Sequence, residues 1–125
     1  KRTLFPLDDH AKRLSRSAHY LGYEIAPEFI RSRLIEFVEM NKPKTSIYIR
    51  PLVYTSDLDI SPRLHEIEKD FLIYGIELGD YLAADGVSAT ISSWVRQSDA
   101  SFPLRAKISG GYITSALAKS EAVER

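Results

Sequence analysis

The sequence predicts an α+β fold, a small domain of α/β-sandwich character in which helices cover a mostly antiparallel sheet. Apolar residues recur at helical spacing over residues 8–22 and 27–41. β-branched and aromatic residues dominate residues 45–55, 70–78 and 87–94, which is typical of strands. With 125 residues and 44% hydrophobic content, the chain is long and apolar enough to bury a core.

The composition argues against several classes of partner. The 17 basic and 17 acidic side chains balance and form no charge run, so nothing favours nucleic acid or an anionic membrane. The chain has no cysteine for disulfides or a cysteine-rich zinc site, and its 3 histidines show no metal-ligand spacing. It also has no apolar run of membrane-spanning length and no signal-peptide pattern. We therefore expect a cytoplasmic protein that binds small molecules or protein.

Both ends of the sequence suggest a fragment of a longer protein. The chain begins without methionine at Lys1, just before a strand-like stretch at residues 3–5, and it stops at Arg125 inside a helical pattern without a cap.

The first predicted helix carries a candidate site residue, Arg13. Asp8 or Asp9 would cap this helix and Gly22 would end it. Its buried stripe comprises Ala11, Leu14, Ala18 and Leu21, and the neighbouring polar stripe comprises His10, Arg13, Ser17 and Tyr20. Arg13 thus lies beside the buried face, where it either reaches into a cleft or is a solvated or ion-paired arginine.

The second predicted helix starts near Pro27 and ends at residues 41–43. We expect it only to cover a sheet, through the apolar residues Ile30, Leu34, Phe37 and Val38.

In the predicted strand 45–55, alternation divides the side chains between two faces. One face carries Ile47, Ile49 and Val53, and the other carries Tyr48, Arg50, Leu52 and Tyr54. Pro51 cannot donate to a ladder, so the strand lies at an edge or is irregular there. The residues alone leave open whether the arginine face is an exposed surface with cation-π stacking or a binding site.

The rest of the chain is predicted as alternating loops and regular elements. Residues 56–69 form a long loop, 70–78 a strand buried on both faces, 79–82 a turn or short helix, and 87–94 a strand with Trp94 in the core. A loop over residues 95–105 leads to a helix that begins at Tyr112, with Ile113, Ala116, Leu117 and Val123 on its packed side.

Residues 105–112 form the stretch best suited to chemistry. Lys107 stands between Ala106 and Ile108 and precedes a glycine pair and Tyr112. A lysine that loses hydration serves as a base or a Schiff-base amine. The alternative is an ordinary solvated lysine near a turn.

Four separated motifs resemble those of the class IV (fold type IV) pyridoxal-phosphate-dependent aminotransferases, most closely the branched-chain amino acid aminotransferases. They are Asp9–Leu14, Tyr48–Val53, Ser92–Trp94 and Lys107–Tyr112, and the similarity runs from Leu4 to Arg125. The resemblance implies pyridoxal 5'-phosphate bound as an imine to the catalytic Lys107, with Tyr112 at its phenolic oxygen and Arg13 at its phosphate. It also implies that Tyr48 and Arg50 border the pocket for an amino acid or 2-oxo acid substrate.

The resemblance further implies two domains and a homodimer in the full-length protein. We expect a small domain over residues 1–74, an interdomain linker over 75–86 and the start of a larger, β-rich, cofactor-binding domain over 87–125, with the fragment alone inactive. The sequence departs from the family pattern in the loop 56–69, at Glu77-Leu78 and at Gly111, where asparagine is common. A D-amino acid aminotransferase or aminodeoxychorismate lyase of the same fold, or a non-catalytic interaction module, remains an alternative.

Overall fold

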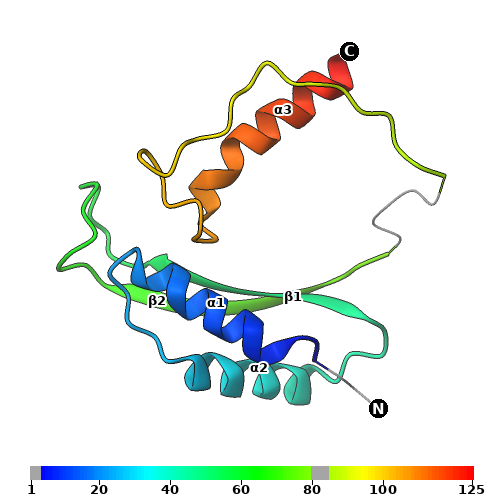
Figure 1. The fold of residues 1–125 in the computed structure, drawn as a ribbon. Helices are drawn as coiled ribbons and strands as arrows, with labels where there is room; N and C mark the ends of the chain where they lie inside the picture. The colour runs from blue at the N-terminus through cyan, green and yellow to red at the C-terminus, as the bar shows by residue number, and fades with distance from the viewer. Residues whose placement is uncertain (1–3, 80–84) are drawn as a thin grey trace. The chain divides into compact units, whose positions relative to one another are not determined.

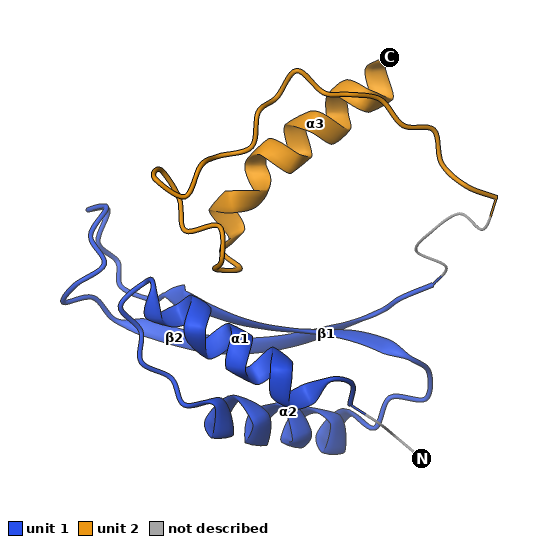
Figure 2. Cartoon of the chain, in the orientation of Figure 1, with its two compact units in different colours: residues 1–79 blue, residues 80–125 orange. Residues whose placement is uncertain are grey.

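The computed structural model describes residues 4–79 and 85–125 of the chain, and it confirms the α+β class. The described elements, in chain order, are α1 (Leu7–His19), α2 (Pro27–Asn41), β1 (Ile47–Thr55), β2 (Lys69–Glu77), the 3₁₀ helix η1 (Ser109–Tyr112) and α3 (Ile113–Glu124) (Figure 1). The chain divides into two compact units, residues 1–79 and 80–125 (Figure 2). None of the described helices has the length and apolar character needed to cross a membrane.

Helix α1 begins earlier than the sequence predicts. Pro6, with φ −79° and ψ 99°, is its N-cap, so neither Asp8 nor Asp9 caps the helix. Both aspartates lie in the first turn, where their charge favours the positive end of the helix dipole. The predicted strand at residues 3–5 is also wrong for its described part: Leu4 has no regular structure and Phe5 lies in a turn.

Helix α2 matches its prediction. Pro27 occupies the first turn, where its missing N–H leaves no hydrogen bond unmade, and Lys42 ends the helix in the left-handed conformation with φ 44°. Ile30 and Leu34 are buried, as expected for the face that covers a sheet.

Strands β1 and β2 form an antiparallel hairpin in which Ile49 lies opposite Gly75 and Val53 opposite Phe71. Both helices pack on one face of this two-stranded sheet (Figure 1). The core consists of Ala11, Ala18, Ile25, Ile30 and Leu34, with Ile49, Val53, Phe71 and Ile73 packed against it from the sheet. The predicted alternation of β1 is therefore confirmed on the covered face.

The prediction that β2 is buried on both faces is wrong. Phe71 and Ile73 face the core, whereas Leu72 and Tyr74 are exposed. In residues 4–79 the helices cover only one face of the sheet, so alternate side chains of β2 remain open to solvent. Strand β2 extends to Glu77, and the first compact unit ends at Gly79. The assignment of residues 75–86 as an interdomain linker stays a prediction.

The predicted strand at residues 87–94 does not form. Its backbone bonds instead to α3 side chains: Ser93 N–H donates to Glu121 and the Ile91 carbonyl accepts from Arg125. Trp94, expected in the core, is about half exposed. The predicted turn at residues 79–82 falls mostly on residues 80–84, outside the described part of the chain.

The expected packed side of α3 is also wrong. Ile113 and Val123 are exposed, and no described residue of 85–125 is buried. Within this unit, α3 runs alongside the extended segment that includes Ile91 and Ser93, to which its last turns bond.

Candidate functional site

The open face of the β1–β2 sheet carries the predicted substrate residues. Tyr48 lies opposite Ile76, and Arg50 lies opposite Tyr74. Arg50 Nη1 donates a hydrogen bond of 3.2 Å to the Tyr74 hydroxyl. The sheet thus presents a cationic group whose position is coupled to a phenol on the neighbouring strand.

A second polar pair occupies the same face. Tyr54 lies opposite Asp70 in the hairpin, and the Tyr54 hydroxyl donates a hydrogen bond of 3.2 Å to Asp70 Oδ2. Burial raises the pKa of the Tyr54 phenol, and the charge and hydrogen bond of Asp70 raise it further. Sequence reasoning placed Tyr54 on this face but missed Tyr74 and Asp70, because their positions depend on the register of the hairpin.

Arg13 is an exposed side chain of α1. In its predicted polar stripe, His10 and Tyr20 are exposed too, but Ser17 is buried, with only 3% of its surface accessible. The Ser17 hydroxyl donates to the Arg13 carbonyl at 2.8 Å, which satisfies a polar group inside the core. The helix thereby holds the Arg13 backbone against the core and leaves the guanidinium in solvent.

In the second unit the structure brings the predicted residues Lys107 and Tyr112 together. Lys107 Nζ lies 5.6 Å from the centroid of the Tyr112 ring, within the range of a cation-π contact. The short helix η1 turns the chain between them. Lys107 is exposed and its neighbours Ala106 and Ile108 are only partly buried, so these described residues do not desolvate the amine as the sequence suggested.

The loop before Lys107 is held by contacts that the sequence did not reveal. Asp99 accepts hydrogen bonds from the Leu104 N–H and the Arg105 guanidinium, both at 3.2 Å. Phe102 packs against the glycine pair: a Cβ built on Gly111 would lie 2.7 Å from the Phe102 ring. The sequence signal for this contact was a single aromatic residue in the loop 95–105.

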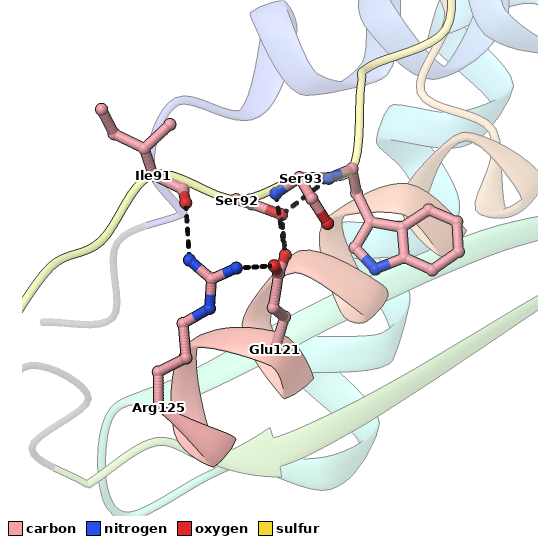
Figure 3. Close-up of polar contacts among 6 residues, drawn as sticks. Ile91, Ser92, Ser93, Glu121 and Arg125 are labelled. Atoms are coloured by element: carbon pink, nitrogen blue, oxygen red, sulfur yellow. Dashed lines mark hydrogen bonds and ion pairs between the residues drawn. The ribbon is translucent and has the colours of Figure 1, made fainter.

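Glu121 links α3 to the segment 91–94 (Figure 3). Its Oε2 accepts from the Ser92 hydroxyl at 2.6 Å and from the Ser93 N–H at 2.9 Å. Its Oε1 pairs with Arg125 at 2.6 Å, and Arg125 also reaches the Ile91 carbonyl at 3.3 Å. The hydrogen bond from Ser92 lowers the pKa of the Glu121 carboxyl most, followed by that from Ser93.

The described residues contain no cluster of three or more histidine, cysteine, aspartate or glutamate side chains that would hold a metal ion. The groups that they offer are a lysine amine next to a phenol, an exposed guanidinium on α1, and a second guanidinium hydrogen-bonded to a phenol on the sheet. A lysine amine is suited to a carbonyl carbon, and a guanidinium is suited to an anion.

Comparison with known proteins identifies the family of this α+β chain. The family model of amino-transferase class IV matches residues 1–125, and the chain belongs to this family.

Individual relatives agree with this family. The chain is 65% identical over 121 residues to a probable branched-chain-amino-acid aminotransferase of Synechocystis sp., a match that covers 97% of this chain and 40% of that protein. It is 36% identical over 118 residues to a protein of the same description from Aquifex aeolicus, covering 92% of this chain and 38% of that protein. The chain therefore spans less than half the length of these relatives.

A solved structure shares the fold. The branched-chain aminotransferase from Thermoproteus uzoniensis, crystallised with norvaline, superposes with a TM-score of 0.86 at 35% identity, covering 94% of this chain and 40% of that one. A second, from Thermobaculum terrenum in its PLP form, gives a TM-score of 0.79 at 27% identity, covering 96% of this chain and 40% of that one.

Proposed function

We propose that this chain is part of a branched-chain amino acid aminotransferase, which exchanges an amino group between a branched-chain L-amino acid and 2-oxoglutarate. The observation that carries the proposal is the contact between Lys107 and Tyr112 in a chain that matches the family over residues 1–125. The names of the relatives, including the Synechocystis protein, support the substrate class.

The donor groups fit pyridoxal 5'-phosphate. A lysine amine suits its aldehyde carbon, a phenol O–H suits its phenolic oxygen and a guanidinium suits its phosphate. When bound, this cofactor supplies an electron sink for the negative charge left when an amino acid loses its α-proton. The PLP form of the T. terrenum structure supports the same cofactor.

Each site residue then has a role toward this cofactor. Lys107 Nζ would hold the cofactor through its aldehyde carbon and would act as the base that moves the α-proton of the substrate. Tyr112 would donate a hydrogen bond to the cofactor's phenolic oxygen, and Arg13 would hold the phosphate with its planar guanidinium. Tyr48 and Arg50 border the substrate pocket, where Arg50 binds the side-chain carboxylate of glutamate or 2-oxoglutarate.

Product analysis of the full-length protein tests this function. Supplied with cofactor, L-leucine and 2-oxoglutarate, the protein should form glutamate. Turnover of D-alanine instead would indicate a D-amino acid aminotransferase, and turnover of aminodeoxychorismate a lyase. A protein that binds no cofactor, as judged by the absence of visible absorbance, would indicate an interaction module.

Borohydride reduction tests the site assignment separately. Reduction fixes the cofactor to the lysine that holds it, and peptide mapping should then find the adduct on Lys107. An adduct on another lysine, such as Lys119, would exclude Lys107 from the proposed role.

Retention of the cofactor tests Arg13. After dialysis, the variant Arg13→Ala should lose more cofactor than Arg13→Lys, because lysine keeps the charge and loses only the bidentate geometry. Equal retention by the wild type and Arg13→Ala would remove Arg13 from the phosphate site.

A cytoplasmic location and assembly as a homodimer belong to the same proposal, as expected for an enzyme of amino acid metabolism in this family. Cell fractionation and light scattering of the full-length protein test these two points.

A further inference from the structure

We infer that Tyr74 is a positioning residue that holds the Arg50 guanidinium for binding of an acidic side chain. This inference rests on the proposed function, since it deepens the role given there to Arg50. Tyr74 lies directly opposite Arg50 in the hairpin, and its hydroxyl oxygen accepts the 3.2 Å hydrogen bond from Arg50 Nη1. Neither the family match nor the motif that contains Arg50 points to Tyr74, which lies on the other strand.

The surroundings of Arg50 explain why such a partner matters. Arg50 lies on the open face of the sheet, and arginine has many rotamers when it is exposed. Tyr74 is 38% exposed on the same face, but its side chain turns about only two bonds. A stiff side chain opposite a flexible one restricts the directions in which the guanidinium can point.

The hydrogen bond to Tyr74 occupies one N–H group of the Arg50 guanidinium and limits how the guanidinium is oriented. Nη1 donates to the phenol, and arginine carries five N–H donors in a fixed plane. A hydrogen bond to one donor restricts the orientations of that plane, and so the directions in which it can meet a carboxylate through two bonds. An aliphatic side chain makes no such bonds, so the benefit should be confined to acidic substrates.

The cross-strand pairs next to Arg50 and Tyr74 support a role in distinguishing acidic from aliphatic substrates. Leu52 pairs with Leu72, and Tyr48 pairs with Ile76, on either side of the Arg50 and Tyr74 pair. A pair with one positive charge, flanked by these largely apolar pairs, offers adjacent surfaces to a carboxylate and to an alkyl group. A transaminase needs both, because both substrates pass through one site.

Steady-state kinetics of Tyr74→Phe in the full-length holoenzyme tests the inference. Loss of the hydroxyl should raise KM for glutamate about fivefold, the scale of one ordinary hydrogen bond, and change KM for leucine by less than about twofold. Tyr54→Phe is the matched control, since it removes a hydroxyl from the same face that bonds to Asp70. In Tyr54→Phe the KM values for glutamate and leucine should keep their ratio.

A double-mutant cycle shows whether Tyr74 acts through Arg50. Arg50→Ala should raise KM for glutamate selectively, and adding Tyr74→Phe to it should then have no further effect on the ratio of the two KM values. The inference would be overturned if Tyr74→Phe changed the KM values for glutamate and leucine equally. It would also be overturned if Tyr74→Phe had its full effect on the KM ratio in the Arg50→Ala background. Neither result would affect the proposed function.

Two other outcomes distinguish failure of the Tyr74 inference from failure of the proposed function. Transamination that is intact but insensitive to Arg50→Ala would overturn the roles of both Arg50 and Tyr74 while leaving the activity. Absence of transamination and cofactor binding in the wild type would overturn the proposed function itself, and the inference with it.

Discussion

Residues 4–79 pack around a buried apolar cluster, whereas residues 85–125 are joined by polar contacts and by contacts of the Phe102 and Tyr112 rings. The first unit buries five hydrophobic side chains between two helices and a sheet, among them Ile30 with no accessible surface. In the described part of the second unit no side chain is buried, and its segments are connected through Glu121, Asp99 and the packing of Phe102 on Gly111.

This difference matters because the two kinds of contact differ in magnitude. Burying one large aliphatic side chain contributes about 1.5–3 kcal/mol, and a typical hydrogen bond contributes about 1 kcal/mol net. The proposed catalytic lysine is therefore carried by the unit with the weaker internal contacts. Stability and activity should respond to different residues in the two units.

The largest expected effect is on activity. In the full-length protein Lys107→Ala should abolish transamination, because no other amine in the motif can bind the cofactor's aldehyde carbon. Stability without cofactor should change by less than about 1 kcal/mol, since Lys107 is exposed and its contact with Tyr112 is a surface cation-π contact. Lys119→Ala, at an exposed lysine of α3, is the matched control and should keep full activity. Residual activity in Lys107→Ala would contradict the assignment.

The next largest expected effect is on stability, and it compares the same substitution in the two units. Ile30→Ala leaves a cavity in the core and should lower the free energy of unfolding by about 2–5 kcal/mol. Ile113→Ala is the same change at a side chain that is 58% exposed, and should cost less than about 1 kcal/mol. Urea unfolding of both full-length variants measures the difference. Similar losses would mean that Ile113 is buried in the full-length protein.

The contrast between a unit with a buried core and a unit held by polar contacts also explains how much of the structure could be predicted from the sequence. Helix α2 was predicted at both ends because Pro27 starts it and its apolar spacing is regular. In β1 the alternation of Ile49 and Arg50 identified the covered and open faces. Periodicity succeeds in this unit because burial determines its structure.

Predictions for the second unit failed where structure depends on a partner. Residues 87–94 have the composition of a strand, but a strand requires a neighbouring strand for its hydrogen bonds, and the described residues supply Glu121 and Arg125 instead. The contact between Lys107 and Tyr112 could be anticipated because the residues are close in sequence. The pairs of Arg50 with Tyr74 and Phe102 with Gly111 could not, since they depend on register and loop packing.

Gly111→Ala should have a smaller effect than the core variant. A Cβ at this position would meet the Phe102 ring at 2.7 Å, so the ring must shift, at a cost of about 1–3 kcal/mol. Gly110→Ala is the matched control, because its Cβ would lie 3.7 Å from the same ring, an ordinary contact. Thermal unfolding of the full-length variants should show a clear loss only for Gly111→Ala. The double variant Gly111→Ala/Phe102→Leu should recover part of it; no recovery would exclude Phe102 as the cause.

The smallest expected effect concerns the dependence of stability on pH. The carboxyl of Glu121 has a pKa below its usual value of 4.5, chiefly because it accepts hydrogen bonds from Ser92 and Ser93. As the pH falls below 4.5, an unfolded chain binds a proton on this glutamate before the folded chain does. The stabilisation is thus fully present above this pH and is lost as the pH drops through the lowered pKa of the folded state.

Glu121→Gln should therefore destabilise the protein at neutral pH and show a smaller further loss between neutral pH and pH 3 than the wild type does. Urea unfolding of the full-length protein at several pH values measures this, with Glu124→Gln as the control on the same helix. Hydrogen exchange should be faster at the Ser93 amide in Glu121→Gln, because that N–H donates to the carboxylate. An unchanged dependence on pH together with unchanged exchange at Ser93 would mean that Glu121 does not hold the segment 91–94, and that the second unit depends on other contacts.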